Sequence, residues 1–367
     1  MSGRADLVRL HGDDPIAFST LQSGLRYCDA SYGYIAYQRA WGIDITLGPP
    51  VAAAADQPLL IERFLRSHRR PVFCYLRADA AQRVLAVGNL AHSPRLHAAG
   101  MGHDRLLPTD FARAADRLLP KPLLGARKHA RRAGFAIERV DASTLSPDRL
   151  ARLAQITAAY LRKSQLPYEM CFLNRPFTPH ERQDPTVQAR TYLLQQRRAA
   201  GQPAQLFGYA VLNPWFDRGQ VAGYLLDILR CEPTRQWGVF YAAVDALCLA
   251  LQQEGIASLS LGFCPLHGTQ AHDPAEARSL LAARCSPRLS AQLAWMEQHL
   301  AAVPYVQRLR ELKTSLPGVS VPRYFVSYSA LALPPFVALM AACGVRLGSL
   351  IGPSLWQSIG QARRSDR

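Results

Sequence analysis

The sequence predicts an α/β (α+β) protein made of two tandem lobes, each with a sheet flanked by helices. Apolar residues alternate with a period of two in several short segments and recur at i, i+3 and i+4 in longer ones. The first pattern is typical of half-buried strands, and the second is typical of amphipathic helices. The order strand, strand, loop, helix, strand occurs twice along the chain, which indicates a duplicated unit.

The first unit lies in the early part of the chain. Residues 33–40 and 42–48 are expected to pair as strands around a Trp-Gly turn. A helix is expected over 57–70, after a Gly-Pro-Pro loop, and a further strand over 71–77. We predict that this unit belongs to a first lobe formed by residues 1–140.

The second unit has the same order of elements. Residues 206–213 and 221–230 are expected to pair as strands. A loop containing proline and glycine leads into a helix over 239–255, and the next strand covers 258–263. We predict that this unit belongs to a second, catalytic lobe formed by residues 141–330.

A basic helical segment precedes the boundary between the lobes. Lys128, Arg131 and Arg132 crowd one stretch, and Gly134 is expected to end the helix. Such a run is either a solvated helix face or a contact for tRNA phosphates or anionic lipid. The next helix is expected to begin after Ser146, because serine is a preferred N-cap residue.

The composition limits the partners and the compartment. The 367 residues carry a formal net charge of +16, which favours polyanionic partners unless it only reflects an Arg-rich solvated surface. The eight cysteines occur singly, without a C-x-x-C pair, which predicts a reducing compartment with neither a zinc site nor a disulfide framework. The first residues lack the apolar core of a signal peptide. We therefore expect a cytoplasmic protein.

Several enzyme classes are excluded by missing motifs. The sequence has no G-x-S-x-G elbow, no Walker loop and no H-x-x-x-H pair. We therefore expect chemistry that needs no metal.

An apolar and basic segment, residues 331–367, ends the chain. The apolar run 330–345 is short for a bilayer span and is interrupted by two prolines, and the last residues read RRSDR. The run is either a core helix or a membrane-surface segment of a protein peripheral to the inner membrane.

The stretch GYLLDILR, residues 223–230, has the residue habits of a buried strand but carries Asp227 and Arg230 near its end. Burying either charge without a partner costs several kcal/mol, on the order of 3–5. Residues three apart point to opposite faces of a regular strand. Either a bulge or the strand end brings both side chains to a cleft, or the two form an ion pair that closes the strand.

The order of elements resembles the GCN5-related acyltransferase fold, with its mixed, mostly antiparallel sheet. In that fold a glycine-rich loop before a helix cradles the pyrophosphate of acyl-CoA. The corresponding loop here reads RCEPTRQWGVFYAA and keeps Arg235 and Gly238, but Phe240 replaces the second glycine. The resemblance implies that Arg235 binds phosphate, while the bulky residues argue against CoA.

One branch of that superfamily is more similar: the catalytic domain of the aminoacyl-phosphatidylglycerol synthases, or phosphatidylglycerol lysyltransferases. Its D-x-x-R strand corresponds to Asp227 and Arg230, and its LGxxPL motif corresponds to residues 261–266. Its terminal K…P…RY signature corresponds to Lys313, Pro317 and Arg323–Tyr324. The resemblance covers about residues 33 to 328.

The resemblance implies roles for the D-x-x-R pair and its surroundings. Asp227 would hold the ammonium group of the aminoacyl donor or accept the proton of the attacking hydroxyl. Arg230 would clamp a phosphate of the lipid or of the tRNA 3′ end. Glu169 is the candidate counterpart of a family acid. His267, just after the LGxxPL motif, is a candidate acid or base, with a structural role as the alternative.

The terminal signature implies further substrate-binding residues. Lys313 and Arg323 would contact phosphate on either side of a Pro-Gly turn, with Tyr324 beside them, unless this is only a solvated basic loop.

These observations predict a bacterial transferase that moves an amino acid from aminoacyl-tRNA to a lipid hydroxyl such as that of phosphatidylglycerol. Its expected partners are aminoacyl-tRNA and an anionic phospholipid or membrane surface, and no cofactor is expected beyond the donor. Two alternatives stay open. One is an acyl-CoA-dependent N- or O-acyltransferase, and the other is a non-catalytic, membrane-associated binding module.

Overall fold

The protein is described here by a computed structural model. The structure describes residues 3–90, 95–113, 119–164, 169–175, 177, 189–197, 204–233, 238–266, 285–300 and 304–345. Arg235, His267 and the segment 346–367 therefore lie outside the described residues.

The first half of the chain contains the first predicted unit. Strands β2 and β3 pair antiparallel, and β3 pairs parallel with β5. Trp41 and Gly42 both have left-handed φ values, 52° and 73°, as a tight two-residue hairpin turn requires. The strands are β1 (Arg26–Ala30), β2 (Gly33–Ala40), β3 (Ile43–Leu47), β4 (Val51–Ala52), β5 (Pro71–Leu76) and β6 (His97–Pro108). The helices are α1 (Arg4–His11), η1 (Ala17–Leu21), α2 (Gln57–Ser67), α3 (Ala78–Leu90) and η2 (Thr109–Arg113).

The second half repeats this unit. Strands β9 and β10 pair antiparallel, and β10 pairs parallel with β11 after helix α6. The duplicated order of elements is therefore confirmed. The strands are β7 (Phe135–Val140), β8 (Arg190–Gln196), β9 (Gln205–Asp217), β10 (Gln220–Cys231), β11 (Ser258–Pro265) and β12 (Val319–Ser327). The helices are α4 (Lys121–Arg132), η4 (Ala142–Thr144), α5 (Pro147–Lys163), α6 (Val239–Gln253), α8 (Pro287–Leu300), α9 (Pro304–Thr314) and α10 (Leu333–Ala342).

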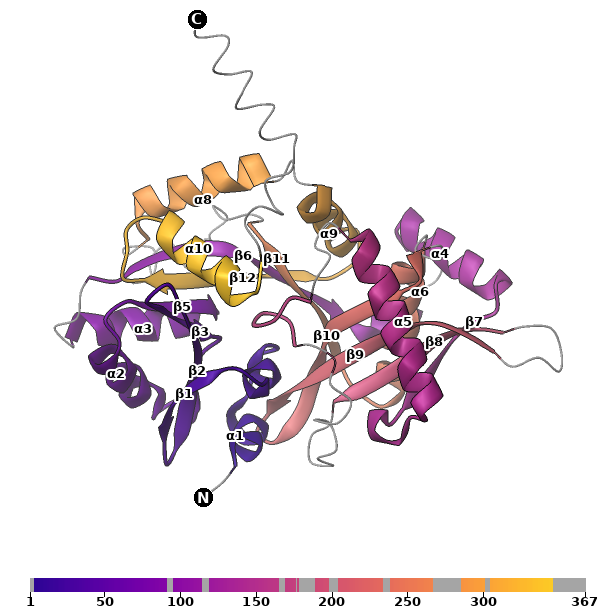
Figure 1. Cartoon of the computed structure of the whole chain (residues 1–367), viewed down its shortest axis with the longest axis horizontal. Coiled ribbons are helices and arrows are strands. Elements are labelled where there is room, and N and C mark those ends of the chain that lie inside the picture. Colours follow the sequence, from indigo (N-terminus) through magenta and orange to yellow (C-terminus); the bar gives the residue numbers. More distant parts are fainter. Residues whose placement is uncertain are drawn as a thin grey trace, which may run out of the picture.

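The two halves share one sheet (Figure 1), and three strand pairings join them. Within the described chain the strand order is β1-β2-β3-β5-β12-β6-β11-β10-β9-β8-β7, with β4 beside β2. Strand β6 of the first half pairs with β11 of the second. Strand β12, from near the end of the chain, lies between β5 and β6. Helix α4 and strand β7 pack against elements of the second half. The lobe boundary near residue 140 stays a prediction.

Helices cover both faces of this mixed, largely antiparallel sheet. On the strands of the first half, α2 and α3 form a core on one face, while α8 and α10, which come from the second half of the chain, form a core on the other. In the second half, α4 and α6 cover one face and α5 covers the opposite one. Figure 1 shows α5 across the near face of these strands. Ser146 caps α5, as predicted, by accepting a hydrogen bond from the Arg149 backbone N–H.

The apolar run near the C-terminus forms helix α10. Its residues Ala338 and Ala342 are fully buried in the core, as the core-helix interpretation predicts, whereas Leu331 and Leu333 just before and at its start are exposed. Within the described residues, no helix combines the length and apolar character that a bilayer crossing requires.

Candidate functional site

A bulge in β10 places Asp227 at a cavity. The register of β10 against β9 shifts between Leu226 and Ile228, so Asp227 is the extra residue. A bulge changes which face the following residues present. Asp227 and Arg230 consequently line the same cavity, which is the arrangement expected from a bulged strand.

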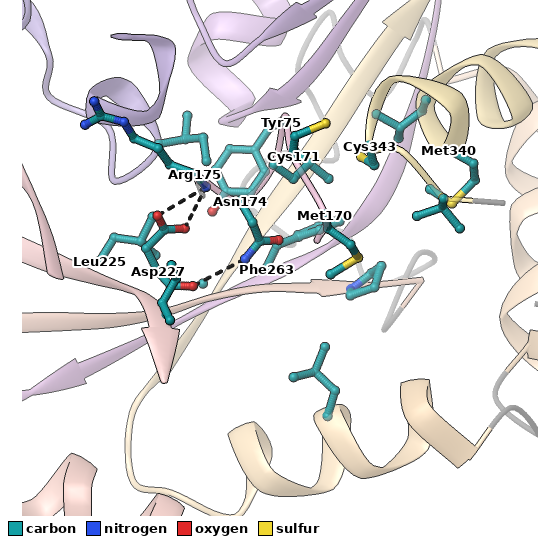
Figure 2. A pocket seen from close by; sticks show the side chains of 18 of the residues that line it. Tyr75, Met170, Cys171, Asn174, Arg175, Leu225, Asp227, Phe263, Met340 and Cys343 are labelled. Atoms are coloured by element: carbon teal, nitrogen blue, oxygen red, sulfur yellow. Dashed lines mark hydrogen bonds between the residues drawn. The ribbon is translucent and has the colours of Figure 1, made fainter. Parts of the chain in front are cut away.

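The Asp227 carboxylate is held by N–H donors from two neighbouring elements. Asn213 Nδ2 on β9 donates to it at 2.8 Å, and the Arg175 backbone N–H lies 3.2 and 3.3 Å from its two oxygens. Asn174 Nδ2 donates to the Asp227 backbone carbonyl at 3.3 Å. Figure 2 shows the bonds from Asn174 and Arg175 reaching Asp227. Asp227 is therefore an oriented acceptor with only 8% of its surface exposed.

Arg230 forms its ion pair with Glu169 rather than with Asp227. Its two terminal nitrogens each bond one Glu169 carboxylate oxygen at 2.6 Å, and one of them lies 3.4 Å from the Tyr209 hydroxyl. Burial opposes the charge, but the hydrogen bonds that Arg230 donates to Glu169 and the neighbouring Tyr209 hydroxyl raise the pKa of Arg230 above its ordinary value. The guanidinium is thus a permanent cation whose orientation is fixed by a bidentate partner.

Lys313, from α9, brings a second cation to the cavity. Its side chain is 8% exposed, and Nζ donates to the Phe263 carbonyl at 2.9 Å. Burial lowers the pKa of Lys313. Gly262 has a φ of +74°, and a Cβ there would lie 3.7 Å from Nζ, so glycine keeps the space beside the ammonium open.

The ammonium lies near the point where β10 and β11 separate. Their parallel pairing runs from Gly223 opposite Ser258 to Leu225 opposite Ser260, and β11 then shifts register against β6 before Phe263. Separated strands leave room between them for a ligand.

The cavity has a volume of about 390 Å³ and two chemically different sides. Its polar lining comes from β10, from the loop at 169–175 and from α9, and includes Asp227, Arg230, Glu169 and Lys313. Apolar side chains line the cavity on every side, but among the described residues the wall formed by β5, β12, α8 and α10 contributes no charged side chain. The members of this wall include Val72, Cys74, Leu293, Phe325, Pro335, Phe336, Leu339, Met340 and Cys343. Figure 2 shows Asp227 on one side and Met340 and Cys343 on the other.

Arg323 and Tyr324 do not line this cavity, which corrects the prediction that they bind substrate. Arg323 is 1% exposed and is held by two carboxylates, Asp14 at 2.6 Å and Asp104 at 2.7 Å. Its guanidinium lies 4.4 Å from the centre of the Tyr75 ring, which separates it from the cavity. Tyr324 is buried in the core beneath α3. Both residues therefore stabilise the sheet.

The remaining predicted residues divide into two groups. His267 and Arg235 lie outside the described residues, so their roles stay predictions. In the basic run of α4, Arg127 is buried against Asp245, whereas Lys128, Arg131 and Arg132 are exposed.

Two contributors to the site were not predicted. Asn213 is a fully buried amide in the otherwise apolar strand β9, opposite Leu225 of β10. A polar residue at an inward strand position is a signal that sequence reasoning can use. The Arg175 backbone N–H carries no such signal, because only the path of its loop brings it to Asp227.

The fold, a single mixed sheet in which a strand–strand–helix–strand unit occurs twice, is the one expected of two GCN5-related acyltransferase-like lobes. The family model for the C-terminal part of phosphatidylglycerol lysyltransferase matches residues 4–327. The chain belongs to this family, as the motifs predicted. A search of curated proteins finds no match.

Solved structures agree with this assignment at the level of the fold. The C-terminal domain of a putative lysylphosphatidylglycerol synthetase from Agrobacterium fabrum is 18% identical, with a TM-score of 0.66 over 92% of this chain and 95% of that one. L-PGS from Bacillus licheniformis is 15% identical, with a TM-score of 0.69 over 94% of this chain and 96% of that one.

Proposed function

We propose that this protein transfers an amino acid from aminoacyl-tRNA to a hydroxyl group of a lipid such as phosphatidylglycerol. The observation that carries the proposal is the two-sided cavity, in which Asp227, Arg230 and Lys313 face an apolar wall. Such a cavity suits two substrates, one polar and one with an acyl region. Membership of the phosphatidylglycerol lysyltransferase family supports the same reaction.

The reaction exchanges one ester for another. The lipid hydroxyl oxygen forms a bond to the aminoacyl carbonyl carbon, the bond from that carbon to the ribose oxygen breaks, and the hydroxyl proton ends on the ribose oxygen. Because both esters are of similar energy, positioning and charge stabilisation supply most of the rate enhancement. No cofactor takes part in this proposed step.

The cavity residues have separable roles in this scheme. Asp227 binds the α-ammonium group of the donor, because its carboxylate is already fixed by Asn213 and the Arg175 backbone. Arg230, oriented by Glu169, binds a substrate phosphate. Lys313 places its ammonium group where β10 and β11 separate. There the positive charge stabilises the oxyanion that develops during transfer or binds the lipid phosphate.

The net charge of +16 supports a polyanionic donor, and the exposed cations of α4 lie on the half that carries the D-x-x-R strand. The acyl-CoA alternative relies on the loop at 234–237, which is outside the described residues. The experiment that tests the proposal therefore has to distinguish aminoacyl-tRNA from acyl-CoA as the donor.

The test is transfer by the purified full chain with radiolabelled aminoacyl-tRNA and phosphatidylglycerol vesicles, read out by lipid extraction. We expect a labelled, ninhydrin-positive lipid, and a loss of about 10²–10³-fold for Asp227→Asn. The matched control is Asp29→Asn, which changes an exposed carboxylate paired with Arg4. Transfer from acyl-CoA alone, or equal activity of Asp227→Asn and the control, would contradict the proposal.

A further inference from the structure

The loop at residues 169–175 fixes the two charged residues of the D-x-x-R strand. Glu169, at its start, pairs with Arg230. The Arg175 backbone N–H, at its end, bonds the Asp227 carboxylate (Figure 2). The conformation of the loop between these two points therefore decides how both charges are presented to the cavity.

Phe172, at the centre of this loop, has a backbone conformation that is unfavourable for its side chain. Its φ is +68°, in the left-handed region that bulky residues rarely adopt. Such a conformation persists only where the surrounding structure holds it in place. The ring is fully buried in the core that contains α8 and α10, so the side chain has a fixed position, but the left-handed backbone needs partners of its own.

Gln22, from the first half of the chain, supplies those partners. Its Nε2 donates to the Phe172 carbonyl at 2.7 Å, and its Oε1 accepts a hydrogen bond from the Phe172 backbone N–H at 2.9 Å. The second Nε2 hydrogen goes to the Ser19 carbonyl at 2.9 Å. One amide thus satisfies both backbone groups of a residue 150 positions away. A carboxylate cannot do this because it only accepts, and an apolar side chain can neither donate nor accept.

Gln22 acts on the cavity only from a distance. It does not belong to the described residues that line the cavity, and it is 4% exposed. Its backbone N–H donates to the Ser19 carbonyl at 3.2 Å, directly after η1, so the amide extends from a fixed turn. Any influence of Gln22 on the reaction must therefore pass through Phe172.

We propose that Gln22 is a positioning residue of the transfer reaction. It holds Phe172 in the left-handed conformation, and through it the 169–175 loop in the form that orients Asp227 and Arg230. This inference rests on the proposed function for the reaction that is affected. It adds that a residue of the first half of the chain sets the geometry of charges carried by the second half.

Gln22→Leu tests the proposal, because leucine is of similar size but forms none of these hydrogen bonds. The matched control is Gln57→Leu. Gln57 is also a buried glutamine of the first half, 6% exposed, and its Nε2 lies 3.2 and 3.3 Å from the carbonyls of Pro50 and Ala52. Both variants should unfold at lower urea concentration than the unmodified protein, because each loses buried hydrogen bonds.

Transfer by the full chain at increasing concentrations of aminoacyl-tRNA separates positioning from stability. We expect the KM for aminoacyl-tRNA to rise about tenfold in Gln22→Leu, because a misoriented Asp227 carboxylate binds the donor ammonium group less well. Partial unfolding alone lowers the apparent kcat and leaves KM unchanged, which is the pattern expected for Gln57→Leu. An unchanged KM in Gln22→Leu, or an equal rise in the control, would overturn the inference.

Hydrogen exchange followed by mass spectrometry tests the same contact without the reaction. Peptides that cover residues 169–175 should exchange about tenfold faster in Gln22→Leu than in the unmodified protein or in Gln57→Leu. Equal exchange in all three proteins would also overturn the inference. If the unmodified protein transfers no amino acid, the proposed function fails, while the exchange result still decides whether Gln22 holds the loop.

A second variant covers the case in which Gln22→Leu does not fold. Gln22→Asn keeps the amide but is shorter by one methylene group, so the pair of hydrogen bonds to Phe172 is lost or lengthened. The same rise in KM and the same faster exchange of the loop are expected, and a folded Gln22→Asn that shows neither change would contradict the proposal.

Discussion

Two ion-paired arginines, the buried Arg323 and the partly buried Arg230, have similar chemistry but different roles. Arg323 in β12 is held by Asp14 and Asp104 and is 1% exposed. Arg230 in β10 is held by Glu169, which is 39% exposed, and it lines the cavity. Both belong to motifs that the family resemblance singles out.

The difference lies in what surrounds each ion pair. Tyr75 covers Arg323 and donates a hydrogen bond to Asp104, so that cluster has no face toward the cavity. Arg230 lines the cavity, and its partner Glu169 is accessible to water. A motif residue is thus a candidate for substrate binding only where the fold leaves it a ligand-accessible face.

The largest expected effect is on stability, from Arg323→Ala. Removing this cation leaves the Asp14 and Asp104 carboxylates buried without their partner, which should lower the free energy of unfolding by about 3–5 kcal/mol. Urea denaturation measures it. The control Arg4→Ala removes an exposed pair and should cost about 1 kcal/mol or less; similar losses for both variants would contradict the comparison.

The reverse pattern is expected for Arg230→Ala. Transfer activity should fall by about 10²-fold, because the oriented phosphate contact is lost, while the free energy of unfolding changes by about 1 kcal/mol or less, since Glu169 regains water. Arg230→Lys should recover little activity, because lysine cannot form the bidentate pair. Full activity of Arg230→Ala would show that this pair is structural, like the Arg323 cluster.

Tyr75→Phe examines the side chain that separates the Arg323 cluster from the cavity. The variant loses the hydrogen bond to Asp104 but keeps the ring, whose edge-to-face contact with Phe263 has a centroid distance of 5.4 Å. We expect the free energy of unfolding to fall by about 1–3 kcal/mol with little change in transfer rate. A large loss of activity without a loss of stability would instead place the Tyr75 hydroxyl in the reaction.

The smallest expected effect is a dependence on pH that belongs to Lys313. Burial holds the pKa of Lys313 in the folded protein below the ordinary lysine value of 10.5, so between these two pKa values the unfolded chain binds more protons and the free energy of unfolding rises with pH. At pH values below the folded-state pKa of Lys313, the ammonium is charged in both states, and its burial lowers the free energy of unfolding by the full amount. Lys313→Met should therefore have a higher free energy of unfolding than the unmodified protein at neutral pH.

The stability advantage of Lys313→Met should shrink as the pH approaches 10.5. Unfolding measured across that range, together with the transfer assay, checks this prediction. An advantage that does not vary with pH, or a variant with full activity, would contradict the assignment of a buried functional cation.

The sequence by itself determined the local elements and their repeat. Alternation and helical spacing predicted the β2–β3 and β9–β10 hairpins and the helices that follow them, because each pattern depends on neighbours within a few residues. The pair of charges in GYLLDILR left three explanations open, a bulge, the strand end or an ion pair between the two, and the structure has a bulge at Asp227.

Only the tertiary structure decided which residues meet. Asp14 binds Arg323 across 309 positions of sequence, and Glu169 binds Arg230 across 61. Strand β12 could not be placed between β5 and β6 from its own pattern, because an alternating strand fits many sheet positions equally well. The physical reason is that sequence patterns specify burial, whereas partners are specified by long-range packing. That packing closed Arg323 into the core and left Asp227, Arg230 and Lys313 facing a cavity.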